Sequence, residues 1–422
     1  NAAMMKLVPP RSAARKDFEL SLDEIAREGA RRMLVRALDL EVEDYITQSV
    51  EEVDENGHRL VVRNGYGKSR TVTMGGGSVE VEAPRVVDRR DGAKFLSAIL
   101  PPYLRKSPKV ESLLPVLYLK GLSTGDFKSA LAEFLGEGTV GLSPASIVKL
   151  KKIWEDEFAV WSKRSITKKY VYIWVDGVNV QIRLGEDKKV CLLVIIGATD
   201  TGEKELLAVH PGYRESAESW STVLRSLIDR GFVAPKVAVG DGALGFWKAL
   251  RSCGGFEKTE EQRCWVHKIA NVLDKLPKRV QPDAKTYLHE MMNAPTEADA
   301  MKARQSFEKL FAEKYPKAVE CLVKSWSELT TFFHYPAAHW KHLRTTNPIE
   351  SSFATVKLRT KVTKGAGNRE TASAMAFKLL LECQKKWRRL RGHDEIQNVL
   401  EGLAYKDGIM IPRELHHEAA AG

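Results

Sequence analysis

Several features are scarce in this chain of 422 residues, and each absence removes a class of protein. There are only five cysteines, an odd number in mostly apolar or helical settings, which argues against a disulfide framework and for a reducing compartment. No run approaches the roughly 20 apolar residues of a membrane span, and the first residues lack a signal-peptide core. Internal repeats and low-complexity tracts are absent too. We therefore expect a cytoplasmic protein without a membrane partner.

Acidic residues are fewer than basic ones. The chain has 55 Asp and Glu residues and 66 Lys and Arg residues, which gives a net charge of +11. A positive excess suits a polyanionic partner such as nucleic acid. It is permissive evidence only, since many basic proteins bind no DNA. Specific chemistry has to come from individual residues.

Three carboxylates stand where a phosphodiester-cleaving site would need them. Asp176 closes the apolar run YVYIWVD, Asp241 closes KVAVGD, and Glu350 lies in the helix that opens TTNPIESSF. Strand ends are rigid platforms for short acidic side chains. Phosphoryl transfer by two Mg²⁺ ions needs hard oxygen ligands that hold the metals roughly 4 Å apart. The three residues are thus predicted ligands of two Mg²⁺ ions, for which Mn²⁺ would substitute.

Each carboxylate also has a purely structural interpretation. Asp-Gly is a common turn dipeptide, so Asp176 and Asp241 could belong to turns. Asn347, Pro348 and Glu350 fit the N-cap, first and third positions of a capping box. Asp200, in GATDTGE, is interpreted as part of a hairpin turn.

The order of elements around these residues predicts the fold class. Three strands joined by short turns, followed by alternating helix and strand, is the order of an α/β RNase H-like catalytic domain with a mixed five-stranded sheet. The expected elements are a strand ending in Asp176, strands 189–198 and 203–210, helix 215–231, strand 236–240, helix 243–252 and a short strand near 260–265.

Five motifs in this order resemble the bacterial mutator-type transposases of insertion sequences, relatives of the eukaryotic Mutator transposases. The motifs are YIWVDGV, GYRESAESW (212–220), VAVGDGALGFWKAL, QRCWVHKIANVL and RTTNPIESSFATVKLRT, and the resemblance covers roughly residues 20–395. It implies that Asp176, Asp241 and Glu350 are the family's DDE triad. It also implies that Cys264 and His267 are its Cys-x-x-His signature.

The Cys264 and His267 pair leaves several interpretations open. A structural zinc site needs four ligands, and His334, His339 and His342 are scattered. Alternatively, His267 contacts the scissile phosphate or a metal-bound water and is catalytic, or it packs at a helix start.

The region before the catalytic core changes character twice. Residues 19–50 show helical apolar spacing with Ser21 as a plausible N-cap. Residues 57–90 alternate as basic strands around the turn Gly75-Gly76-Gly77, which lacks the Lys-Ser/Thr of a phosphate-binding loop. An α+β region is therefore expected ahead of the helices.

Residues 107–165 return to a helical pattern that allows helix-turn-helix DNA binding. Helices are expected at 107–120, from Ser123 to Leu135, and from Ser143-Pro144 onward, a cap followed by proline at the first helical position. The third carries Lys149, Lys151 and Lys152, which suit phosphate contacts. An ordinary helical hairpin is the alternative.

Glu350 follows Asp241 by 109 residues, too many for an uninterrupted RNase H core. Residues 266–338 have helical patterns and are predicted to form a helical insertion.

Just beyond the insertion, Trp340 could contact DNA at the cleavage point. Two basic runs, KLRTKVTKGAGNR at 357–369 and KKWRRLRG at 385–392, flank the path of a DNA backbone. The expected DNA-contacting residues are Arg63, Arg70, Lys149, Lys151, Lys152, Trp340, Arg344, Lys357, Arg359, Lys361 and Lys364.

The chain is accordingly predicted to divide into eight parts. These are a flexible N-terminal segment (1–20), a helical region (21–56), a basic β-hairpin segment (57–92), a helical DNA-binding region (93–166), the first part of the core (167–265), the insertion (266–339), the second part of the core with the catalytic helix (340–395), and a tail (396–422).

The resemblance implies a transposase that binds the terminal inverted repeats of its element as double-stranded DNA. It would cut one strand to expose a 3′-hydroxyl and join that hydroxyl to target DNA. Synapsis of two ends implies at least a homodimer on DNA, and the resemblance implies a bacterial protein at the nucleoid. Two alternatives are an RNase H-like nuclease that only hydrolyses and a transposase-derived DNA-binding regulator without catalysis.

Overall fold

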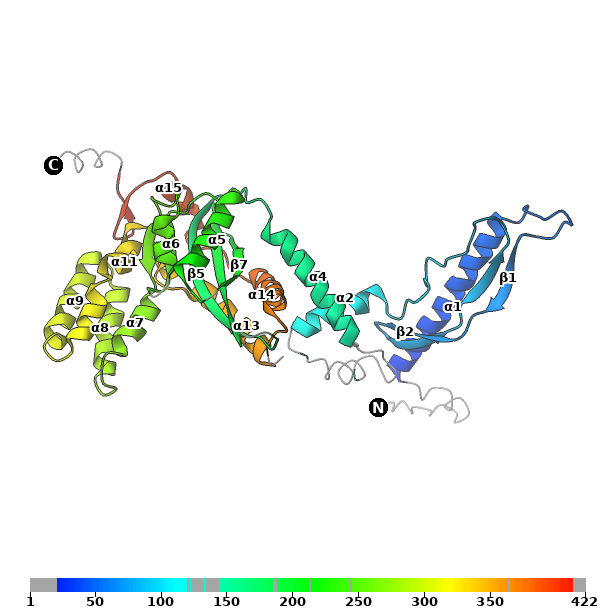
Figure 1. Cartoon of the computed structure of the whole chain (residues 1–422), viewed down its shortest axis with the longest axis horizontal. Coiled ribbons are helices and arrows are strands. Elements are labelled where there is room, and N and C mark those ends of the chain that lie inside the picture. The colour runs from blue at the N-terminus through cyan, green and yellow to red at the C-terminus, as the bar shows by residue number, and fades with distance from the viewer. Residues whose placement is uncertain are drawn as a thin grey trace, which may run out of the picture. The chain divides into compact units, whose positions relative to one another are not determined.

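The computed structural model describes residues 21–119, 122, 133, 144–184, 188–212, 214–242, 245–362 and 365–412. The chain divides into two compact units, Asn1–Val148 and Lys149–Gly422 (Figure 1). The predicted N-terminal segment 1–20 lies outside the described residues.

The N-terminal unit pairs a long helix with two small sheets. Ser21 caps the helix through a capping box with Glu24, as its N-cap position predicted. The glycine turn joins two antiparallel strands, also as predicted. Leu38 and Val81 lie in its apolar core. Its elements are α1 (Leu22–Gln48), β1 (Val61–Tyr66) paired with β4 (Pro84–Asp88), β2 (Arg70–Met74) paired with β3 (Gly77–Val81), and α2 (Pro108–Leu119).

The helix-turn-helix prediction can be followed only in part. The helix expected from Ser123 to Leu135 and the glycines after it lie outside the described residues, apart from the single position 133. Helix α4 (Pro144–Ser162) begins at the proline that predicted its start. In the second unit, α4 packs on α14 (Arg369–Gln384), where the rings of Trp161 and Phe377 lie 4.6 Å apart.

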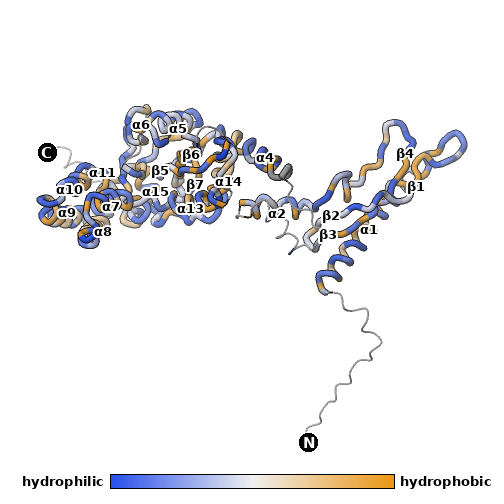
Figure 2. Tube along the Cα trace, turned by 60° about the horizontal axis from the view of Figure 1, so that its bottom comes forward, coloured by the Kyte–Doolittle hydropathy of each residue, from blue (hydrophilic) through white to orange (hydrophobic). Residues whose placement is uncertain are grey.

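A mixed five-stranded sheet forms the centre of the second unit, in the order β7-β6-β5-β8-β9, which confirms the predicted α/β sheet. Strands β5, β6 and β7 are antiparallel, whereas β8 and β9 run parallel to β5. Hydrophobic residues follow β5, β6 and β7 (Figure 2). The bounds are β5 (Tyr170–Gln181), β6 (Lys189–Thr199), β7 (Lys204–Gly212), β8 (Val237–Gly240) and β9 (Glu260–Arg263).

One strand boundary was predicted wrongly. Strand β5 does not end at Asp176 but continues to Gln181, so Asp176 and Gly177 form no turn. They pair instead with Val194 and Leu193 on β6. The continuation VNVQ keeps the alternation of buried and exposed residues that a strand with one covered face needs. Strand β8 does end directly before Asp241, as predicted.

Helices cover both faces of the sheet, and alternate residues of β5 serve each face. Ile173 and Val175 belong to a core cluster with Trp220 and other residues of α5 (Ala217–Asp229) and α6 (Phe246–Ser252). On the opposite face, Tyr172 bonds to His339 at 2.8 Å. That face also carries α13 (Asn347–Val362), which packs against β5 and α14.

The predicted insertion is helical, and Figure 1 shows α7, α8 and α9 grouped at one end of the unit. Its own core contains Leu288, Phe307 and Leu322. The elements are α7 (Trp265–Leu273), α8 (Gln281–Asn293), α9 (Glu297–Phe311), α10 (Pro316–Val323), α11 (Trp326–Thr330), the short helices η1 (Thr331–His334) and η2 (Ala337–His339), and α12 (Trp340–Leu343). After α14 come η3 (His393–Glu395), α15 (Ile396–Leu400), β10 (Tyr405–Lys406) and β11 (Ile409–Met410).

Among the helices of the described ranges, none is both long and apolar enough to cross a membrane.

Candidate active site

The parallel register of β5 and β8 brings two of the three predicted carboxylates together. Trp174 is paired with Val239, so Asp176 and Asp241 each follow by two residues on neighbouring strands. Side chains at matched positions of adjacent strands lie about 5 Å apart. The main chain around Asp241 is held by the Trp247 indole, which donates to the Asp241 carbonyl at 2.6 Å.

Glu350 reaches the site from α13, and its carboxylate does not cap the helix. The helix begins at Asn347, whose N–H is bonded to the Thr345 hydroxyl. The Oε1 of Glu350 instead accepts a hydrogen bond from the hydroxyl of Thr346, the residue before the helix. The capping-box interpretation with Asn347 as N-cap is therefore wrong.

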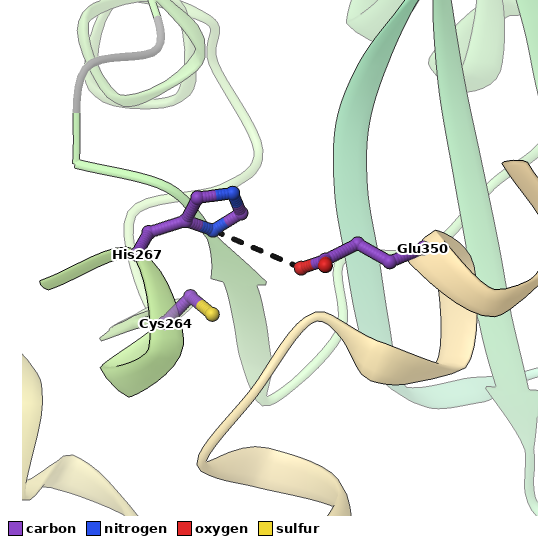
Figure 3. A group of neighbouring side chains, drawn as sticks. All are labelled: Cys264, His267 and Glu350. Atoms are coloured by element: carbon purple, nitrogen blue, oxygen red, sulfur yellow. Dashed lines mark ion pairs between the residues drawn. The ribbon is translucent and has the colours of Figure 1, made fainter. Parts of the chain in front are cut away.

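Cys264 and His267 meet Glu350 at the start of α7 (Figure 3). His267 Nδ1 lies 3.8 Å from Glu350 Oε1. The Sγ of Cys264 lies 3.4 Å from the Thr346 N–H nitrogen and 3.2 Å from the Thr346 Oγ1. The Thr346 N–H donates to the Cys264 sulfur, and the Thr346 hydroxyl lies within donor distance of both that sulfur and the Glu350 carboxylate. Thr346 thus links the Cys-x-x-His pair to the carboxylate of Glu350.

Glu215 is a fourth acidic residue at the site, which the sequence reasoning did not select. A Cβ on Gly177, next to Asp176, would come within 2.1 Å of the Glu215 carboxylate, so the absence of a side chain there admits Glu215. The Glu215 carbonyl accepts the Gly245 N–H at 2.9 Å. Its signal was present in the sequence, since Glu215 lies within GYRESAESW, one of the five motifs.

The electrostatics show one interacting group of charges. Burial raises the pKa of Asp176 to about 7, with Glu215 and Glu350 adding to the rise. Burial and the charge of Asp241 raise the pKa of Glu215. Contact with Cys264, and the charges of Asp241 and Glu350, raise the pKa of His267 to about 9. Carboxylates that share a partly buried site in this way are a functional arrangement more often than a stabilising one.

The oxygen donors fit a hard divalent cation. The Oδ1 of Asp241 is buried without a hydrogen-bond partner, an orphaned acceptor of the kind that a cation would satisfy. Asp176 and Asp241 supply short carboxylates from the sheet edge, and Glu350 extends from the facing helix. This donor set matches Mg²⁺ or Mn²⁺, which prefer carboxylate and water oxygens.

A zinc interpretation fits less well. Cys264, His267 and Glu350 place their ligand atoms within 4.8 Å of one another, but this group has three members where a structural zinc site needs four. Of the other candidate histidines, His339 bonds to the Gly392 carbonyl at 2.7 Å, and His342 accepts the Arg391 N–H. Both of these rings therefore already have hydrogen-bond partners within the protein.

The predicted DNA-contacting residues occupy different environments, and several are exposed. Lys357 and Lys361 are exposed on α13, the helix of Glu350. On α4, Lys149 is exposed, Lys151 is half-buried, and Lys152 forms an ion pair with Asp156 at 3.1 Å. Lys149, Lys357 and Lys361 are thus exposed to solvent, and none of them forms an ion pair within the described residues.

The remaining candidates are engaged within the protein. Arg359 is 1 % exposed and Trp340 is 8 % exposed, with its indole donating to the Tyr335 carbonyl, so neither offers a surface for DNA in this structure. Arg63 is paired with Asp39, Arg70 donates to the carbonyls of Leu100 and Pro101, and Arg344 donates to Asn293. Lys364 lies outside the described residues.

Comparison with known proteins identifies the family. The family model "Transposase, Mutator family" matches residues 7–390. The transposase for insertion sequence element IS6120 of Mycolicibacterium smegmatis is 48% identical over 305 residues, covering 72% of this chain and 93% of that protein. The transposase for IST2 of Acidithiobacillus ferrooxidans is 43% identical over 283 residues, 67% of this chain and 95% of its own length. The transposase for ISRM5 of Rhizobium meliloti (strain 1021) is 26% identical across 89% of this chain and 92% of its own. The chain therefore belongs to the Mutator family of transposases.

Proposed function

We propose that this chain is a DDE transposase that binds the terminal inverted repeats of an insertion sequence and catalyses metal-dependent DNA strand cleavage and strand transfer. The α/β unit is proposed to be an RNase H-like catalytic domain interrupted by the helical insertion at residues 266–339. The observation that carries the proposal is the β5–β8 register, which aligns Asp176 with Asp241 beside the electrostatically linked Glu350.

Asp176, Asp241 and Glu350 are the residues proposed to hold two Mg²⁺ ions, for which Mn²⁺ would substitute. When bound, such ions supply positive charge to the attacking and leaving oxygens of the phosphodiester. Thr346 orients Glu350 through its hydroxyl. His267, 3.8 Å from the Glu350 carboxylate, is proposed to donate a hydrogen bond to the scissile phosphate. The roles of Cys264 and Thr346 are to position Glu350.

The proposed partner is double-stranded DNA, both the element ends and the target. Exposed Lys357 and Lys361 on the helix of Glu350 support a backbone path beside the carboxylates. The lysines of α4 are proposed as a second set of phosphate contacts. Synapsis of two ends requires at least a homodimer on DNA. Action on chromosomal DNA in a bacterium places the proposed site of function in the cytoplasm, at the nucleoid.

The test combines purified full-length chain with labelled DNA that carries the element's ends, in Mg²⁺ or Mn²⁺. We expect nicked strands with a 3′-hydroxyl and joined strands. Hydrolysis without joining would replace the proposal with a nuclease of the same fold. Binding without cleavage in both metals would replace it with a DNA-binding regulator.

The Asp241→Asn variant tests the site within the same assay. It should abolish cleavage and joining while DNA affinity stays close to that of the wild type, because the amide keeps the shape but removes the charge that a metal needs. Strand cleavage retained by this variant would reject the assignment of Asp241. Analytical ultracentrifugation of the joining-competent complex should give two or more copies of the chain.

A further inference from the structure

A cavity of about 400 Å³ with a basic lining lies near the end of β5, the start of β6 and the end of β7. Four cationic side chains line it, from Lys188 and Lys189 at the start of β6, Arg214 after β7, and Arg369 at the start of α14. Asn179 of β5 contributes an amide. No carboxylate is among the described residues that line the cavity, so its charge is strongly positive.

The cavity lies close to Glu215, on the face of the sheet that carries Gly177 and Asn179, whereas Asp176, at an alternate position of β5, belongs to the other face. Gly177, against which Glu215 lies, and Asn179 are two residues apart on β5 and so share one face. Arg214 is the residue directly before Glu215. From Asp176 to Asn179, β5 rises by about 10 Å, at roughly 3.3 Å per residue. DNA rises by 3.4 Å per nucleotide along one strand. The cavity therefore lies within a few nucleotides of a phosphate held at the carboxylates.

The backbone conformation at Arg214 is an unusual one. Arg214 has a φ of 58°, in the left-handed region that residues other than glycine seldom adopt. Such conformations are concentrated at ligand-binding sites. Lys188, Lys189 and Arg214 are exposed. Lysines, arginines and an asparagine amide are the side chains that proteins use for phosphate oxygens.

We propose that this cavity binds a backbone phosphate of the DNA strand a few nucleotides from the scissile phosphate and so sets the register of the strand at the carboxylates. The distance of this phosphate from the scissile phosphate rests on the proposed function, whereas the binding of a phosphate in the cavity does not. DNA and a free anion such as inorganic phosphate would both present phosphate oxygens to the cavity. The experiments below distinguish DNA bound across the cavity and the carboxylates from a free anion bound in the cavity alone.

The first experiment measures DNA binding against salt concentration. The variant Lys188→Gln with Lys189→Gln is compared with the wild type and with Lys278→Gln plus Lys285→Gln, which removes two exposed charges from the helical insertion. Each lost phosphate contact reduces the slope of log K against log[salt] by about 0.9. We expect a reduction of about 0.9 to 1.8 for the cavity variant and none for the control. An unchanged slope in the cavity variant would overturn the proposal.

The second experiment locates the bound phosphate. Single uncharged methylphosphonates are placed at successive positions around the cleavage point, and the cleavage rate is measured for each. At one or two positions the wild type should lose rate by about tenfold, and the cavity variant should show no further loss there, because the contact is already absent. The control variant should keep the full penalty. Equal penalties at every position in the wild type and the cavity variant would overturn the assigned register.

The two proposals can fail separately. If the wild type cut no DNA, the function proposed above would fall, yet the salt slope would still report on the cavity. If the wild type cut DNA and the slopes were equal, the function would stand and the cavity proposal would fall. Calorimetric binding of inorganic phosphate that depends on Lys188 and Lys189, with no change in DNA binding, would reject a DNA site in favour of a free anion.

Discussion

Carboxylates are used in opposite ways in the two units. In the N-terminal unit they are paired: Asp88 contacts Arg90 at 2.7 Å and accepts from the Tyr45 hydroxyl at 2.6 Å. Glu41 accepts from the Ser97 hydroxyl and from two backbone N–H groups that include that of Ala98. These contacts attach α1 to β4 and to the segment at residues 97–99.

In the second unit the carboxylates at the sheet edge are set against one another. Burial and the charges of Glu215 and Glu350 raise the pKa of Asp176, and burial and the charge of Asp241 raise the pKa of Glu215. An oxygen of Asp241 is buried without a hydrogen-bond partner. Grouped like charges oppose folding, so their presence points to a role that stability does not explain. Neutralising a carboxylate should therefore have opposite effects on stability in the two units.

The largest effect is expected from Asp176→Asn. Strand cleavage should fall by roughly 10³-fold or more, as expected when one member of a cooperating catalytic group is lost. The melting temperature of the second unit should stay the same or rise, because a buried charge among like charges is removed. Calorimetry and the cleavage assay would be run on the same preparation. A lower melting temperature would break the comparison, since it would make Asp176 a stabilising residue.

Thr346→Val should reduce the cleavage rate by about 10- to 100-fold, the usual effect of losing a group that orients a metal ligand. The hydroxyl that bonds Glu350 is lost while the shape is retained. Thr346→Ser keeps the hydroxyl and should restore most of the rate. DNA affinity should be unchanged in both, measured by fluorescence anisotropy. Equal rates for the valine and serine variants would exclude a positioning role.

Asp88→Asn should lower the melting temperature of the N-terminal unit without changing cleavage chemistry in the second. Arg90, followed by Tyr45, holds the pKa of Asp88 well below its usual range. The stabilisation is therefore present above the unfolded pKa of about 3.9 and is lost as the pH falls below it. Calorimetry from pH 7 to pH 3 should show a smaller acid destabilisation in the variant. Asp44→Asn, at an exposed position of α1, is the control, and an equal effect there would refute the pairing argument.

The smallest effect is expected from Glu41→Gln. The amide keeps one oxygen acceptor for the backbone N–H groups but presents an NH₂ group where the Ser97 hydroxyl donates. The melting temperature of the N-terminal unit should fall by less than for Asp88→Asn. A larger fall would show that Glu41 contributes more to the attachment of α1 than the ion pair of Asp88 does.

Much of the fold could be predicted because its signals are local. The apolar runs of β6 and β8, the cap at Ser21 and the proline that starts α4 each depend on neighbouring residues. The end of β5 was misjudged because Asp176-Gly177 has the composition of a turn. Pairing with Leu193 and Val194 on β6 overrides that local preference.

The candidate site divides in the same way. The residue types of Asp176, Asp241 and Glu350 and their motifs could be read along the chain, and they indicated the chemistry and the family. Glu215 is not identifiable locally, because its place depends on the space above Gly177, 38 positions earlier in the chain. The contact of Thr346 with Cys264 likewise forms only when the starts of α13 and α7 meet.

By itself, then, the sequence determined the order of strands and helices, the basic charge and the acidic residues with their family motifs. These follow from the periodicity and chemistry of neighbouring residues. Only the tertiary structure decided that Cys264 and His267 meet Thr346 and Glu350, that Arg359 and Trp340 are buried, and that Lys188, Lys189, Arg214 and Arg369 line one cavity. The physical reason is that contacts between distant segments are set by strand register and helix packing, which no local pattern encodes.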